Sequence, residues 1–225
     1  MSNIHIDKLI RTQRRTIGLH ITSDAKLIVR APLFTPEDSI YKLIERKEAW
    51  IKSKQEYFRI RQPKTCPRRF IPGEKYLFLG KEYSLVAVED IPKAVILAGS
   101  LMISKMVLNN AKEHLTNWYK TQAYEHICQQ VEYYAHITAL TYRSIKVNDA
   151  KTRWGSCGAL DTLNFTWRLI MAPPRVIDYV VVHELMHLKQ KNHSRHFWKE
   201  VSSIIPDYKQ DQAWLKENTH FLTWP

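Results

Sequence analysis

Two histidines and a glutamate stand in an otherwise apolar stretch, VVVHELMHLKQ, which begins at Val180. His183 and His187 are four residues apart, so on a helix their imidazoles lie one turn apart on the same face. Glu184 completes the pattern HExxH, in which the histidines bind zinc and the glutamate takes a proton from the zinc-bound water. A buried polar group without a partner costs several kcal/mol, and metal coordination removes that cost. The spacing therefore predicts a zinc site; the alternative is a pair of solvated or hydrogen-bonded histidines.

A catalytic zinc ion usually takes three protein ligands and keeps one position for water, so this motif needs one more ligand. His193 lies six residues beyond His187, and His196 lies nine beyond it. If the helix ends near Asn192, a residue type that tolerates a left-handed turn, the chain doubles back towards the metal at His193. We therefore predict His193 as the third ligand. The alternatives are His196, more simply interpreted as a surface residue of the next helix, and a distant carboxylate.

The same spacing partly matches HExxHxxGxxH, the metzincin pattern. Gln190 occupies the position of the glycine, and no methionine follows Met186, so the Met-turn beneath a metzincin site is missing. The sequence therefore argues against a metzincin.

The segment KTRWGSCG, which contains Arg153, Trp154 and Gly155, is a second candidate for the site. Arg153 fits equally well at the rim of a substrate cleft and in an ion pair with an acid. Trp154 is better explained by packing between a helix and a sheet. Tyr179, one turn before His183, has the chemistry to donate to an oxyanion, but a core tyrosine is the favoured interpretation. No residue is identified as the transition-state stabiliser.

Residues 1–107 predict a β-rich region with one helix. The segment RTIGLHITSDAKLIVRAP alternates with the period of a half-buried hairpin. The segment TPEDSIYKLIERKEAWIKSKQEYFRI has apolar residues at helical spacing after a capping Thr35. Two further segments, KYLFLGKEYSLVAV and AVILAGSLMIS, each predict a strand, a turn with glycine and a second strand.

Residues 108–225 predict a second region with the chemistry. A long helix over residues 110–139 carries a wide apolar stripe, and two short strands, SIKVND and TLNFTW, follow it. The HExxH helix then begins after two prolines, which a first helical turn permits. The fold class is α+β: a β-rich N-terminal half with one helix, followed by a long supporting helix, a small sheet, the HExxH helix and C-terminal helices.

Three segments, TRWGSCG, WRLIMAPPRVIDYVVVHELMHL and NHSRHFW, are similar in order and separation to the YgjP-like metallopeptidase domain family. This family consists of small zincins related to SprT-like proteases. The resemblance covers most of the chain and implies a compact zincin core. It also implies that His183, His187 and His193 are zinc ligands and that Glu184 is the catalytic glutamate.

Positive charge is concentrated at the front of the chain. Of the formal net charge of +12, residues 1–70 contribute +9, with 16 Lys and Arg against 7 Asp and Glu. Such an excess attracts polyanions through counterion release, although basic surfaces also occur without such a partner. The charge predicts a weak nucleic-acid contact through the basic N-terminal region.

The remaining composition predicts a cytoplasmic protein. The cysteines, Cys66, Cys128 and Cys157, are odd in number and far apart, which favours reduced thiols over a disulfide framework or a CxxC metal pair. No apolar run reaches the roughly 18 residues of a membrane span, and MSNIHIDKLIRTQRR lacks the apolar core of a signal peptide. We therefore expect no membrane partner.

The functional hypothesis is a zinc metallopeptidase that hydrolyses a polypeptide substrate through a zinc-bound water, with Glu184 as general base. Two alternatives stay open. One is a DNA-associated protein with a structural zinc site, which would need a fourth protein ligand and would have no use for Glu184. The other is a zinc hydrolase of a non-peptide bond. The oligomeric state and the cleavage specificity do not follow from the sequence.

Overall fold

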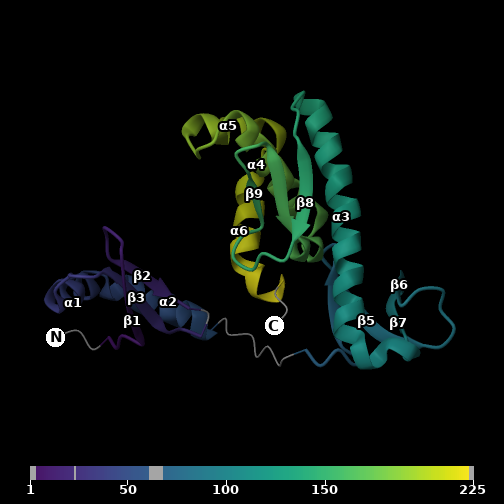
Figure 1. Ribbon diagram of the computed structural model, residues 1–225, viewed down its shortest axis with the longest axis horizontal. Coiled ribbons are helices and arrows are strands. Elements are labelled where there is room, and N and C mark those ends of the chain that lie inside the picture. Colours follow the sequence, from purple (N-terminus) through teal and green to yellow (C-terminus); the bar gives the residue numbers. More distant parts are fainter. Residues whose placement is uncertain (1–3, 23, 61–67, 223–225) are drawn as a thin grey trace. The chain divides into compact units, whose positions relative to one another are not determined.

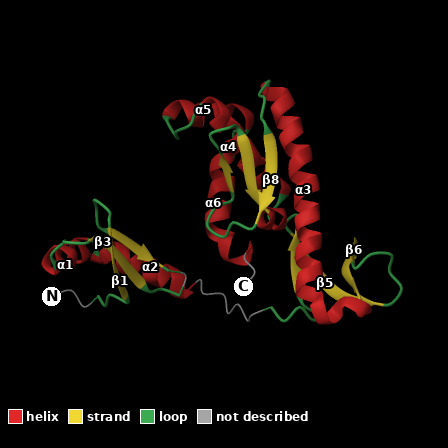
Figure 2. Ribbon diagram, viewed as in Figure 1, coloured by secondary structure: helices red, strands yellow, loops and turns green. Residues whose placement is uncertain are grey.

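The computed structural model describes residues 4–22, 24–60 and 68–222. The chain folds as two compact units, residues 1–66 and 67–225. Each unit combines helices and strands, as Figure 2 shows in red and yellow, and the expected α+β class is confirmed. The predicted site residues all belong to the second unit.

The first unit contains a three-stranded sheet in the order β1-β3-β2. Strand β3 (Leu27–Pro32) pairs antiparallel with β2 (Gly18–Ile21) and parallel with β1 (Lys8–Thr12). The β2–β3 pair is the predicted hairpin, which is confirmed. Its inward side chains meet those of the helices in a small core, formed by Ile21, Leu27, Val29, Ala31, Ile40, Ile44 and Ile51.

The helical segment of the first unit is two consecutive helices rather than one. Helix α1 (Glu37–Arg46) ends at its C-cap, Lys47, and α2 (Glu48–Ile60) begins at the next residue. The backbone N–H of Lys47 donates to the carbonyls of both Leu43 and Ile44, which marks the interruption. The apolar spacing continues across this one residue, which is why the sequence pattern alone predicts a single helix.

The second unit begins with a four-stranded sheet in the order β4-β5-β7-β6. The strands are β4 (Lys75–Phe78), β5 (Lys81–Val88), β6 (Val95–Ala98) and β7 (Ser100–Ser104). Pairs β4–β5 and β6–β7 are antiparallel hairpins, as predicted, and a parallel β5–β7 pairing joins them.

This sheet shares its core with the part of the chain that carries the HExxH motif. The hydroxyl of Tyr119 donates to the carbonyl of Leu77 at 2.7 Å. The turn between β4 and β5 donates from Leu79 N–H to the carbonyl of Ile170 at 2.8 Å. Residues 67–107 therefore group with the second unit, whereas the sequence analysis expects a boundary near residue 107. The division into two domains at residue 107 stays a prediction.

Helix α3 (Ala111–Thr138) is the long supporting helix and runs along one side of the second unit (Figure 1). Its buried stripe includes Leu115, Tyr119, Ile127 and Val131, as the sequence pattern predicts. The helix ends at Ala139, which has a left-handed φ of 52°.

A second three-stranded sheet has the order β8-β10-β9. Strand β10 (Thr162–Thr166) is parallel to β8 (Ser144–Asn148) and antiparallel to β9 (Gly155–Cys157). Strands β8 and β10 were predicted, whereas β9 lies in a segment for which the sequence predicts only a connection. Its small residues and its length of three residues hide the strand pattern, and β9 occupies an edge of the sheet.

The HExxH helix is α4 (Pro174–Lys189), on which α3, α5 and α6 pack (Figure 1). The remaining elements complete the second unit. They are η1 (Lys105–Asn110), η2 (Trp167–Met171), α5 (Arg195–Ile204), α6 (Tyr208–Asn218) and η3 (Thr219–Leu222). In the described part of the chain, no helix has the length and apolar character that crossing a membrane requires.

Candidate active site

Helix α4 places two histidines and the glutamate at the surface of the core. It starts at Pro174, whose missing N–H would be unpaired in a first turn anyway. Val176, Val180 and Leu185 are among its buried side chains and fix the orientation of the helix. The rings of His183 and His187 lie 4.9 Å apart between centroids, on one face as the four-residue spacing requires.

The third histidine of the group comes from the connection between α4 and α5. His193 follows the end of α4, and its Nε2 lies 2.9 Å from Nε2 of His183. One ring nitrogen from each of His183, His187 and His193 lies within 4.8 Å of the others. The two helical histidines are partly buried, whereas His193 is exposed. The structure therefore brings together the three histidines that the sequence analysis selected.

The protonation of the histidines suits a metal. Burial, followed by the neighbouring His187 and His193, lowers the pKa of His183 to about 3, and burial also lowers the pKa of His187. Both rings are therefore neutral at physiological pH, which is the form that binds a metal. Nδ1 of His187 lies 2.8 Å from the carbonyl oxygen of Gln190, so as the protonated nitrogen it leaves Nε2 free as ligand.

Glu184 is a buried carboxylate beside this group. Its side chain is 5% exposed, and within the described part of the chain its Oε2 is buried without a hydrogen-bond partner. Burial raises its pKa to about 8, while the charge of Arg153 and the backbone N–H of Cys157 lower the pKa. A buried carboxylate with an unpartnered oxygen, next to three histidines, leaves room for a polar group that the described residues do not supply.

Strand β9 lies directly against Glu184. A Cβ atom on Gly155 would stand 2.6 Å from Cγ and 2.6 Å from Oε1 of Glu184, closer than real Cβ contacts come. A larger residue at this position would therefore force the Glu184 side chain to shift. This close approach explains the first glycine of WGSCG better than the tight connection that the sequence suggests.

A cavity of about 340 Å³ opens onto His183 and Glu184, between α4, α6 and β9. Trp154 and Tyr179 line it. Trp154 is half-buried and packs on the core, so it is both a packing residue and a cavity wall. Tyr179 is 5% exposed and hydrogen-bonds Gln212, and burial raises its pKa to about 12. The tyrosine is thus a core residue that also borders the cavity.

Aromatic rings hold the exposed His193 in place. The ring of Trp198 stacks on that of His193 at 5.6 Å between centroids, with an interplanar angle of 24°. Phe197, fully buried, lies 4.6 Å from the ring of His187 and 4.9 Å from that of His193. These contacts restrict a histidine that no regular element carries.

His196 takes no part in the group. It is exposed on α5, and its Nε2 lies 3.8 Å from Oε1 of Glu200. Over residues 4–22, 24–60 and 68–222, the group contains no fourth His, Cys, Asp or Glu. Three histidines without a fourth protein ligand could hold a metal ion and leave one of its coordination positions open, whereas a closed structural zinc site uses four protein ligands.

A family model described as YgjP-like, metallopeptidase domain, matches residues 15–218. The chain belongs to the YgjP-like metallopeptidase family. No curated protein matches the chain significantly. Membership of the family assigns the protein to the metallopeptidases in general, whose substrates are polypeptides, and it agrees with the resemblance found in the sequence.

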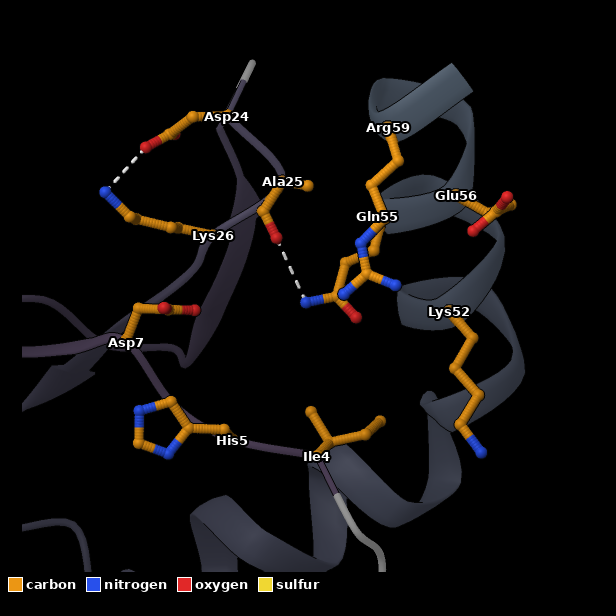
Figure 3. A pocket seen from close by; sticks show the side chains of 10 residues that line it. All are labelled: Ile4, His5, Asp7, Asp24, Ala25, Lys26, Lys52, Gln55, Glu56 and Arg59. Carbon is orange, nitrogen blue, oxygen red and sulfur yellow. Dashed lines mark hydrogen bonds and ion pairs between the residues drawn. The ribbon is translucent and has the colours of Figure 1, made fainter. Parts of the chain in front are cut away.

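A larger cavity of this YgjP-like protein is formed by residues of the first unit. It has a volume of about 720 Å³, and Figure 3 shows the side chains that line it. Acidic Asp7, Asp24 and Glu56 alternate there with basic Lys26, Lys52 and Arg59. Charges of both signs give no uniform field, so this cavity does not support the predicted nucleic-acid contact.

On the same α4, a second carboxyl group gives a stability prediction. Oδ1 of Asp178 is buried without a partner among the described residues, and the hydroxyl of Tyr134 hydrogen-bonds to the carboxyl. Burial raises the pKa of Asp178 to about 6, against the opposing hydrogen bond from Tyr134. A raised pKa in the folded state means that stability is fully present below the unfolded value, near 3.8, and declines as the pH rises through about 6.

We therefore expect Asp178→Asn to stabilise the protein at pH 8 by about 1–2 kcal/mol, after allowance for solvent screening, and to change little at pH 4. This corresponds to a rise in Tm of roughly 2–8 °C at pH 8. Tyr134→Phe removes the donor and should lower the Tm at pH 8. Equal Tm shifts for Asp178→Asn at pH 4 and pH 8 would contradict the burial argument.

Proposed function

We propose that the protein is a zinc-dependent metallopeptidase in which His183, His187 and His193 bind the metal and Glu184 is the general base. The observation that carries this proposal is the meeting of three histidine nitrogens beside a buried carboxylate at the mouth of a cavity. A zinc ion at these histidines would supply a Lewis acid that activates a water molecule and polarises the scissile carbonyl.

Glu184 accepts the proton of the attacking water and then delivers it to the leaving nitrogen. The backbone N–H of Cys157 and the close packing of Gly155 orient its carboxylate. The pKa of about 8 applies without a metal, and a dication nearby favours the ionised form that a base needs. The same carboxyl thus holds the proton between the two halves of the reaction.

The edge strand β9 suits an extended substrate. Its pairing with β10 uses one side only, so a polypeptide that adds as a further strand gains backbone hydrogen bonds without a sequence requirement. Arg153, exposed just before β9, carries a charge that acts on Glu184 and is available to the same cleft.

Digestion of an unfolded protein tests the proposal. The zinc-loaded chain should cut it, a chelator should stop the cutting, and added zinc should restore it. Mapping the cut sites then gives the specificity. Purified zinc-loaded protein that leaves unfolded polypeptides intact would argue for the hydrolysis of a non-peptide bond instead.

The close approach of Gly155 gives a second test of the same site. Gly155→Ala should displace the Glu184 carboxylate and lower kcat by roughly 100-fold, because a misplacement of about 1 Å has costs of that size. The zinc content should stay normal. Gly158→Ala is the matched control, since a Cβ there meets no atom nearer than 3.5 Å. Wild-type kcat in Gly155→Ala would show that the contact does not matter for catalysis.

A structural zinc site and a nucleic-acid contact both stay predictions, and fewer observations support them than support the peptidase. The open coordination of three histidines and the buried Glu184 favour catalysis over a closed zinc site. The excess of basic residues at the front of the chain is the basis of the nucleic-acid prediction.

A further inference from the structure

A further cavity, which we call the basic groove, adjoins the group of His183, His187 and His193 on the side of α5. It lies between α5 and the start of α6 and has a volume of about 790 Å³. Arg195, Lys199 and Lys209 line it together with His196, Trp198 and Tyr208. None of the proposed zinc ligands lines this groove, and the proposed reaction does not use its residues.

The groove carries permanent positive charge that the fold does not neutralise. No Asp or Glu lines it. Arg195, Lys199 and Lys209 are exposed, and within the described ranges none of them makes an ion pair. The nearest acids in sequence have other partners. Glu200 lies 3.5 Å from Lys189 and 3.8 Å from His196, Asp207 accepts from Gln210 at 3.2 Å, and Asp211 pairs with Arg175.

Trp198 borders both the basic groove and the histidine group. Trp198 lines the groove, and its ring stacks on His193 at 5.6 Å and lies 5.7 Å from the ring of His183. The basic groove therefore begins beside the histidine group.

We propose that the basic groove binds an acidic segment of the polypeptide substrate, on one side of the bond that is cut. This inference rests on the proposed peptidase function. The groove supplies three cations to complement carboxylates of an extended chain whose scissile bond lies at the histidine group. It would make acidic flanking residues a determinant of specificity.

The aromatic residues of the groove favour a peptide over a nucleic acid. Trp198 and Tyr208 stack on each other at 5.1 Å with an angle of 13°, Trp198 also stacks on His193, and Tyr208 stacks on Tyr179 at 6.4 Å. Single-stranded nucleic acids bind by stacking bases on free aromatic faces. In the basic groove, neighbouring rings of the protein cover the faces of Trp198 and Tyr208. The groove therefore recognises a ligand by its charge.

Peptide binding to zinc-loaded Glu184→Gln protein tests the proposal without cleavage. Two fluorescent peptides differ only in a flanking segment of four residues, which is Glu and Asp in one and Gln and Asn in the other. At about 50 mM salt the acidic peptide should bind roughly tenfold more tightly, and the ratio should shrink at about 300 mM salt. The triple variant Arg195→Gln/Lys199→Gln/Lys209→Gln should bring the ratio close to one.

A matched variant controls for net charge. Lys81→Gln/Lys93→Gln/Lys146→Gln removes three exposed charges elsewhere on the second unit and should keep the tenfold ratio. If the triple groove variant does not fold, Lys199→Glu alone should lower the ratio in the same direction. Equal binding of both peptides by the parent protein, or an unchanged ratio in the groove variants, overturns the proposal.

Two further measurements, of oligonucleotide binding and of peptide cleavage by wild type, distinguish a nucleic-acid surface from a failure of the proposed function. A single-stranded oligonucleotide whose binding disappears in the triple variant, while the peptide ratio does not change, would make the groove a nucleic-acid surface and the proposal wrong. Failure of zinc-loaded wild type to cut either peptide counts against the proposed function. The binding ratio still decides the groove in that case, because it does not depend on cleavage.

Discussion

Replacing His183, His187 or His193 with alanine is expected to remove most of the zinc from the purified protein. Each substitution leaves two protein ligands, and two imidazoles hold the metal too weakly to survive purification. Loss of a group that only supports a ligand costs about 10- to 100-fold in affinity, so loss of a ligand should cost more. The three nitrogens lie within 4.8 Å of one another, so all three variants should behave alike.

His196→Ala is the matched control for this series, because it removes a histidine from the same segment. His196 is exposed and faces Glu200, so its alanine variant should keep the full zinc content. Metal analysis after dialysis gives the stoichiometry, with one zinc per chain expected for the wild type. An empty site in His196→Ala together with a full site in His193→Ala would contradict the ligand assignment.

Local spacing carried the prediction of the histidine group. The four-residue interval on a helix places His183 and His187 on one face. The left-handed turn expected at Asn192 is wrong, because α4 already ends at Lys189 with an extended Gln190 and Asn192 has no positive φ, yet His193 does return to the other two histidines. The first argument depends on helix geometry alone, which is why it works without tertiary structure, whereas the path of the chain from Gln190 to His193 depends on packing that the sequence does not show. The role of each residue in metal binding and catalysis stays a prediction until it is measured.

Two features of the site depend on packing that the sequence pattern does not show, and sequence reasoning missed them. Gly155 and Glu184 are 29 positions apart, and nothing local shows that a Cβ on the glycine would meet the carboxylate. Trp198 has helical spacing that fits a core or surface residue equally well. Its stacking on His193 appears only when α5 packs beside the end of α4.

In the fold, too, local features were predicted from the sequence and long-range packing was not. The hairpins β2–β3, β4–β5 and β6–β7 follow from alternating apolar residues around a turn and are confirmed. The packing of the β4–β7 sheet against the rest of the second unit depends on long-range contacts, such as that of Tyr119 with Leu77. Periodicity does not encode such contacts. Strand β9 is too short and too rich in small residues to show a period.

The second large effect is expected for Glu184→Gln, because this substitution separates catalysis from metal binding. Glutamine has nearly the same volume and fits the space beside Gly155, so the fold should not change. The amide accepts no proton at neutral pH, and loss of a general base costs about 100- to 10,000-fold in rate. Glu184 is not among the three grouped ligands, so the zinc content should stay at the wild-type level.

The most direct measurement is the rate of peptide cleavage by zinc-loaded Glu184→Gln beside wild type, at equal zinc content and after a check of the Tm. The account predicts one zinc per chain in both proteins and cleavage by the variant at least about 100-fold slower. A zinc-loaded Glu184→Gln protein that cuts the peptide at the wild-type rate would contradict the proposed mechanism.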